Sequence, residues 1–249
     1  MWRFDVLQAK VLETCPHALH VQSYAHIFNL VLSQSLNNIP ECKVLFSSLN
    51  GIATFTSHSS RGMLTLTELL LRKISSFGLT VWSLSSCSVN MVDEHRVLNI
   101  EYFEDIETQD AWSANDKMAA IGYKNFLRKF ETIFVLKLFY SVFASSNILY
   151  NLLHTNPLDV IFCATKINEF HEYLHRERDT QFQLLWNTSN DLAQPREIKR
   201  LKCNIVGSVE SKYRMFFYEI IKNLLNNLRV LFPYIGRNGI FWPTELWEI

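Results

Sequence analysis

Glycine and proline are scarce in this chain, with 7 glycines and 6 prolines among 249 residues. These residues make tight turns, so their scarcity disfavours a turn-rich sandwich or barrel and favours long helices. An excess of charge of one sign is also lacking, because 24 Lys and Arg residues balance 24 Asp and Glu residues. No overall field therefore draws the chain toward nucleic acid or an anionic membrane, and any contact with nucleic acid has to be local.

Closely spaced cysteines are absent too. The five cysteines are Cys15, Cys42, Cys87, Cys163 and Cys203. An odd, scattered set disfavours a zinc finger and a disulfide framework, and is typical of buried thiols in a reducing compartment. The first residues lack the apolar stretch of a secretory signal, and the apolar run 134–143 is too short to span a bilayer. We therefore expect an intracellular protein, nuclear or cytoplasmic, with no membrane partner.

Hydrophobic residues make up 48% of the chain and aromatic residues 13%, which suffices for one large core or two small ones. They recur at helical spacing along most of the chain and predict a mainly α fold. A weak alternation over residues 19–24 predicts a short strand, residues 75–86 look irregular, and residues 194–207 look like a loop. The helices are expected over residues 25–36, from Pro40 through Phe55, 64–74, 126–153, 159–178 and 209–232. The side chains expected to be buried are Trp82, Phe130, Phe134, Leu224 and Leu228.

His171, Glu172 and His175 have the H-E-x-x-H spacing of zinc peptidases. In such enzymes the two histidines bind Zn²⁺ and the glutamate activates its water. On a helix, however, the apolar stripe of residues 163–174 leaves His171 at its edge and turns Glu172 toward solvent. The extended motif also lacks its next ligand, because Gln181 stands where a histidine is needed. We therefore interpret the motif as a charged, solvated helix face and expect no bound metal.

Four basic residues lie close together in the expected loop of residues 194–207. They are Arg196, Lys199, Arg200 and Lys202. Lysine and arginine side chains contact phosphate groups without reading base sequence, and such binding weakens steeply as salt rises. From this segment we expect only weak and non-specific contact with DNA.

The segment CPHALHVQSYAHIFNLVLSQSL resembles a strand-and-helix segment of hAT-superfamily transposases, both active and domesticated. The similarity is to the zinc-finger MYM-type and general transcription factor II-I repeat-containing members of that group. The residues that match the family motif are Tyr24, Ala25, His26, Asn29, Leu30 and Val31. Ser23 stands where the family often has cysteine. Trp82 matches the family's T-R-W motif, although Val81 replaces its arginine.

The segments FLRKFETIFVLKLFYSVFASSNILYNLL and SKYRMFFYEIIKNLLNNLRVLF resemble two helices of the family's long helical insertion. The matching blocks follow the family order over residues 15–232. The resemblance implies a partial RNase H-like segment, a short strand plus a helix, within residues 1–86. It implies an all-helical insertion domain in residues 87–232 and a divergent tail in residues 233–249. The motif residues of the first segment, and Trp82, would have structural roles.

In hAT transposases three carboxylates of an RNase H-like core hold two divalent metal ions, which promote strand cleavage and joining. The first two carboxylates precede the segment that matches here, and Glu245 and Glu248 do not fit the third. The resemblance therefore implies a domesticated, transposon-derived protein or fragment with no catalytic residues and no cofactor. It implies a nuclear protein that binds DNA weakly, binds a protein partner or associates with itself.

Two other interpretations stay open. One is a zinc metallopeptidase that uses His171, Glu172 and His175. The other is a degenerate transposon reading frame that folds only in part and has no selected function. Metal analysis distinguishes the first from the rest, and cooperative unfolding distinguishes the second from a selected binding module.

Overall fold

The computed structural model describes residues 23–36, 39–58, 81–156, 159–193, 197 and 208–233 of the chain. These residues form helices and no strand, so the prediction of a mainly helical fold is confirmed for this part of the chain. The helices are α2 (Tyr24–Leu36), α3 (Pro40–His58), α5 (Val81–Glu94), α6 (Arg96–Thr108), α7 (Ala114–Arg128), α8 (Phe130–Thr155), α9 (Val160–Leu192) and α11 (Val209–Leu231).

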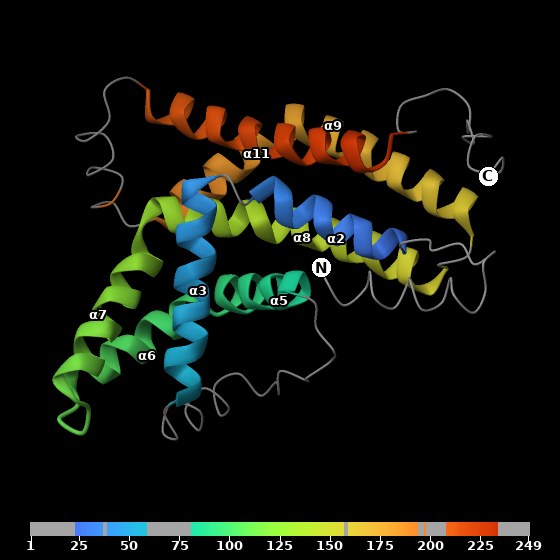
Figure 1. The fold of residues 1–249 in the computed structure, drawn as a ribbon. Helices are drawn as coiled ribbons and strands as arrows, with labels where there is room; N and C mark the ends of the chain where they lie inside the picture. The colour runs from blue at the N-terminus through green and yellow to red at the C-terminus, as the bar shows by residue number, and fades with distance from the viewer. Residues whose placement is uncertain are drawn as a thin grey trace, which may run out of the picture.

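α8 runs along the middle of the bundle (Figure 1), and its first two turns carry buried residues on every side. Consecutive residues from Thr132 through Leu136 are all buried, and so are Phe139 and Phe143 further along. α2, α5 and α9 pack along this helix, and α3 and α7 contact it as well. Because these first turns are apolar on every side, other helices have to cover them on every side, whereas Tyr140, Ala144 and Ile148 leave one face of the later turns exposed.

An aromatic cluster joins α8 to α9 and α11. The ring centroid of Phe130 lies 5.0 Å from that of Tyr213 and 5.2 Å from that of Trp186, both in edge-to-face geometry. Phe134 also meets Tyr213, with 5.0 Å between centroids. Edge-to-face pairs add about 0.5–1.5 kcal/mol beyond the burial of their area. The cluster therefore holds three helices together through rings from residues 130–213 of the chain.

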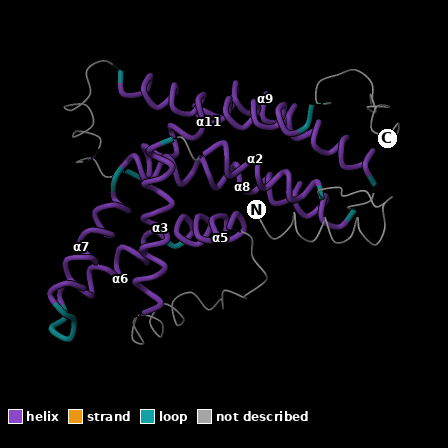
Figure 2. The backbone as a smooth tube through the Cα atoms, viewed as in Figure 1, coloured by secondary structure: helices purple, strands orange, loops and turns teal. Residues whose placement is uncertain are grey.

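α6 and α7 form a hairpin that projects from one end of the bundle (Figure 2). Its connection ends at Ser113, whose side chain accepts a hydrogen bond from the Asp116 backbone N–H and begins α7. Ion pairs from Glu104 to Arg128 and from Glu107 to Lys124 tie the two helices together. The acidic residues of α6 thus face a basic stripe on α7.

The structure corrects three helix boundaries. Residues 81–86, expected to be irregular, belong to α5. The expected helix over 126–153 is divided, because Lys129 has an extended backbone (φ −66°, ψ 138°) between α7 and α8. α9 continues to Leu192 rather than ending near residue 178, since Phe182 and Leu185 extend its buried stripe past a charged turn.

Parts of the predictions lie outside the described residues. The expected strand over 19–24 is one of them, except that Tyr24 is the first residue of α2. The expected helix over 64–74 and the Trp82 side chain are others. Burial is confirmed for the four other side chains predicted to be in the core, which are Phe130, Phe134, Leu224 and Leu228.

One hydrophobic core combines residues from both sides of the expected boundary at residue 86, because α2 and α3 pack against α8. The division into domains stays a prediction. By length and composition α8 could cross a membrane, but 61% of its apolar window is buried inside the bundle. Such burial fits the core helix of a soluble protein.

The Leu224→Ala substitution should lower the free energy of unfolding by about 2–5 kcal/mol, because Leu224 is fully buried and the smaller side chain leaves a cavity. Urea unfolding followed by circular dichroism measures the change. Met215→Ala on the same helix is the control. Met215 is 73% exposed, so its truncation should cost less than about 0.5 kcal/mol. Equal effects of the two substitutions would contradict the placement of α11.

Candidate functional site

The two histidines of the zinc-like motif lie one turn apart on α9 and meet Arg229 of α11. The Arg229 Nε–H donates a hydrogen bond to His171 Nε2 at 3.2 Å. Its Nη2 lies 3.3 Å from His175 Nε2. The two imidazole rings meet edge to face, with 4.7 Å between centroids. The motif thus forms a contact between two helices.

The arginine determines which nitrogen of His171 carries the proton. A guanidinium only donates, so His171 Nε2 accepts with its lone pair and the proton of the neutral ring sits on Nδ1. Nδ1 is buried and has no hydrogen-bond partner among the described residues. Glu172 Oε1 lies 3.5 Å from Nδ1, too far for a good hydrogen bond.

His171 is only 2% exposed, which corrects the expectation of a solvated helix face at this position. Glu172 does point to solvent as predicted, with its side chain 56% exposed. The helical wheel placed His171 at the edge of the apolar stripe, and α11 packs over that edge. The partner helix therefore buries a residue that α9 alone would leave half-exposed.

A zinc ion at this motif would need the lone pairs that Arg229 now occupies. Zinc binds histidine through a deprotonated ring nitrogen, and here the Nε2 atoms of both histidines face a guanidinium charge. Across the part of the chain that the structure describes, no group of three or more His, Cys, Asp or Glu side chains is placed to hold a metal ion. The arrangement is suited to interhelical packing.

Burial lowers the pKa of His171 below its ordinary value of 6.5. The neighbouring His175 and the positive charge of Arg229 lower it further, while Glu172 acts in the opposite direction. Burial penalises the charged imidazolium, and the guanidinium repels it. The α9–α11 contact is therefore built for a neutral His171.

The family-motif residues lie along α2. Ser23 begins this helix, because its side chain accepts a hydrogen bond from the His26 backbone N–H at 3.2 Å. The ring of Tyr24 stacks on Phe232 of the chain segment after α11, with 6.0 Å between centroids. Ala25 is buried, whereas the His26 side chain is exposed.

The three remaining motif residues of α2 differ in burial, and Val31 is fully buried. Asn29 and Leu30 are half-buried, and Asn29 Oδ1 has no hydrogen-bond partner among the described residues. One turn further on, Asn227 of α11 donates a hydrogen bond to Ser35 Oγ at 3.0 Å. The motif segment is thus one wall of the bundle, held by packing and by this polar contact.

The four basic residues expected to contact DNA lie outside the described residues. They are Arg196, Lys199, Arg200 and Lys202. Of the segment 194–207, the structure describes only Glu197. Their role in nucleic-acid contact stays a prediction.

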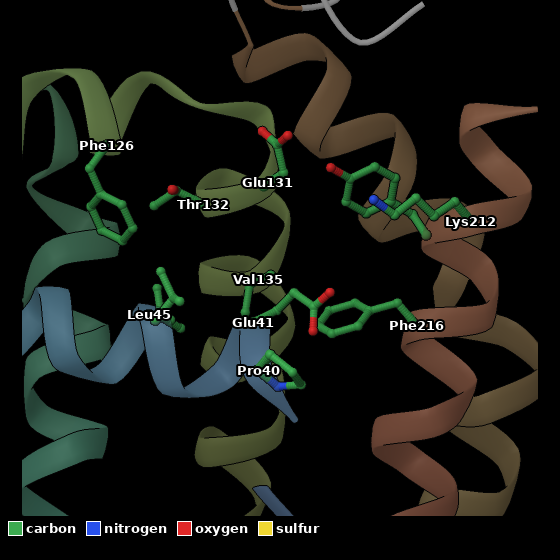
Figure 3. Close-up of a pocket in the computed structure, with 11 residues that line it drawn as sticks. Pro40, Glu41, Leu45, Phe126, Glu131, Thr132, Val135, Lys212 and Phe216 are labelled. Atoms are coloured by element: carbon green, nitrogen blue, oxygen red, sulfur yellow. The ribbon is translucent and has the colours of Figure 1, made fainter. Parts of the chain in front are cut away.

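A pocket of about 270 Å³ lies where the first turns of α3, α8 and α11 meet (Figure 3). Its walls are mainly apolar and include Leu45, Phe126, Val135, Tyr213 and Phe216. Sequence periodicity did not find this pocket, because it arises from the convergence of helix ends that are far apart in the chain. Clustered aromatic walls with a few polar groups are typical of binding sites.

No protein-family model and no solved structure matches this chain. The similarity to hAT-superfamily transposases therefore depends on the motif residues and their order.

Stability should fall as the pH drops below about 6.5, because the unfolded chain then binds a proton at residue 171 that the folded chain resists. The contribution is fully present above the unfolded pKa and is lost as the pH falls through the lowered folded pKa. Urea unfolding between about pH 7.5 and pH 5 measures it. His171→Leu should reduce the slope of stability against pH.

His26→Gln is the control for that measurement, since the His26 side chain is exposed on α2. An equal change of slope in the two variants would contradict a special role for the buried histidine. A wild-type stability that rises on acidification over this range would contradict it as well.

Proposed function

We propose that this chain is a non-catalytic helical module, derived from an hAT-superfamily transposase, that acts by binding a partner. The order of the matching blocks over residues 15–232 supports this origin. The resemblance assigns residues 87–232 to the helical insertion of that family, and the described residues of this range are helical almost throughout. The carboxylates that do the family's chemistry belong to a different part of the fold.

The contact of Arg229 with His171 and His175 is the observation that carries the proposal. The H-E-x-x-H motif resembles a catalytic site. Its contact with Arg229 explains the two histidines as residues that pack α9 against α11. The metallopeptidase alternative requires Arg229 to leave both Nε2 atoms before zinc enters, and it requires a third ligand. Elemental analysis distinguishes the two, because a peptidase would hold about one zinc per chain.

The continuous core favours a selected module over a degenerate reading frame. Each of the described helices contributes residues to a single buried cluster. Agreement between local helix signals and global burial is a property of sequences selected to fold. Unfolding of the whole chain in one cooperative transition would support the module, and a broad transition would support the degenerate frame.

DNA is the second partner class that the resemblance implies. The basic residues proposed for it are Arg196, Lys199, Arg200 and Lys202. Four such contacts would give weak binding that does not depend on base sequence and that declines steeply with salt. Salt-resistant binding to one sequence would contradict this part of the proposal.

The purified chain should not nick supercoiled DNA in the presence of Mg²⁺ or Mn²⁺, because strand cleavage of the family's kind needs a carboxylate cluster that positions two metal ions. Gel analysis of plasmid relaxation measures this activity. The control is the double variant Glu245→Gln and Glu248→Gln. Nicking that depends on Mn²⁺ and is lost in the double variant would overturn the non-catalytic proposal.

A further inference from the structure

The pocket between α3, α8 and α11 has the size of a side-chain anchor site. Its volume of about 270 Å³ exceeds the roughly 150 Å³ of an apolar cavity that binds benzene, so a bulky aromatic side chain would fit. Phe126 of α7 and Phe216 of α11 supply aromatic walls on either side of Val135 (Figure 3), and Tyr213 of α11 is a third aromatic residue of the lining. An apolar group that enters is therefore surrounded by rings.

Apolar surface continues from the pocket to its rim. Val44 of α3 lines the pocket and is 59% exposed, and Phe216 of α11 is half-buried. Removal of such surface from water stabilises a complex in proportion to the area covered. Val44 and Phe216 thus offer apolar surface to residues that flank a side chain bound in the pocket.

The rim is acidic on the side where α3 and α11 meet. Glu41 lies in the first turn of α3, and Glu219 lies on α11; both are exposed. Burial raises the pKa of the Cys42 thiol to about 12, and the charges of Glu41 and Glu219 add to that rise. Glu219 follows the pocket residue Phe216 by three positions on α11 and so lies on the same side of that helix, while Glu41 itself lines the pocket.

These two carboxylates have no ion-pair partner among the described residues. Glu131 of α8 is the second carboxylate of the lining besides Glu41, and the lining holds the single amine of Lys212. The net charge of this rim is negative. It would repel the phosphates of a nucleic acid and attract a basic segment.

We infer that this pocket is a docking site for a partner protein, and that it takes an aromatic or large aliphatic side chain of a segment whose neighbouring residues are Lys or Arg. The apolar anchor fills the pocket, and the basic residues lie along the edge formed by Glu41 and Glu219. Burial of the anchor gives the affinity, while the charges select the segment and accelerate its approach. The inference rests on the proposed function only in that the chain acts by binding.

The probe for the test is a short fluorescein-labelled peptide in which Trp and Leu recur at helical spacing and Lys fills the other positions. Fluorescence anisotropy against the full chain measures binding. A matched peptide with Glu in place of every Lys tests the charge, and a second with Ala in place of Trp and Leu tests the anchor. Only the first peptide should bind, and its binding should weaken as salt rises.

Val44→Lys should weaken binding of that peptide by about tenfold or more, because it places a positive charge at the rim of the pocket. Val44 is exposed, so the variant should fold like the wild type, which circular dichroism checks. Ile148→Lys is the matched control. Ile148 is 65% exposed on α8 and does not line the pocket, so this variant should bind as the wild type does.

The charge of the rim is tested by the double variant Glu41→Gln and Glu219→Gln, with Glu101→Gln on α6 as its control. The double variant should bind less tightly and lose most of the salt dependence, while the control should change neither.

Equal binding of the Glu peptide, equal effects of Val44→Lys and Ile148→Lys, or self-association of the chain through this pocket would overturn the inference. These outcomes differ from nicking of DNA, which would overturn the proposed function and leave the pocket untouched.

Discussion

The need to cover the buried residues of α8 organises the described part of the chain. In its first two turns these residues face in all directions, so no single partner helix could cover them. α9 runs back along it, α2 and α5 lie beside it, and α11 closes the bundle through α9 and α2. The aromatic cluster of Phe130, Trp186 and Tyr213 fixes the positions of α9 and α11 relative to α8. The contact of Arg229 with the two histidines and the pocket between α3, α8 and α11 both result from that arrangement.

The contact of His171 and His175 with Arg229 arises where α11 packs over the edge of the α9 stripe. The helical spacing that lets two histidines share a metal also lets them share an arginine. Whether the histidines bind a metal ion or an arginine depends on the residue that the neighbouring helix places beside them. α11 places the guanidinium of Arg229 there. The pocket has a similar cause, because the first turns of three helices converge around it. Each site is thus produced by tertiary packing.

Periodicity sufficed to predict the helices whose stripes are long and regular. The stripe of α11 gave the bounds of that helix to within one residue and predicted the burial of Leu224 and Leu228. The break at Lys129 could not be predicted, since neither glycine nor proline marks it. The predicted end of α9 near residue 178 is too early, because Phe182 is still buried one turn later. The partner of His171 lies 58 residues away, and no local pattern contains that information.

The central claim is that Arg229 stabilises the fold through its hydrogen bond to His171 and that the two histidines do not form a metal site. A double-mutant cycle with His171→Leu and Arg229→Met measures their coupling from free energies of unfolding in urea at neutral pH. Met keeps the apolar stem of the arginine and removes its guanidinium. We expect a favourable coupling of about 0.5–3 kcal/mol, the range for side chains in direct contact. Coupling near zero, together with stoichiometric zinc binding by the Arg229→Met variant and by the wild type alike, would contradict the account.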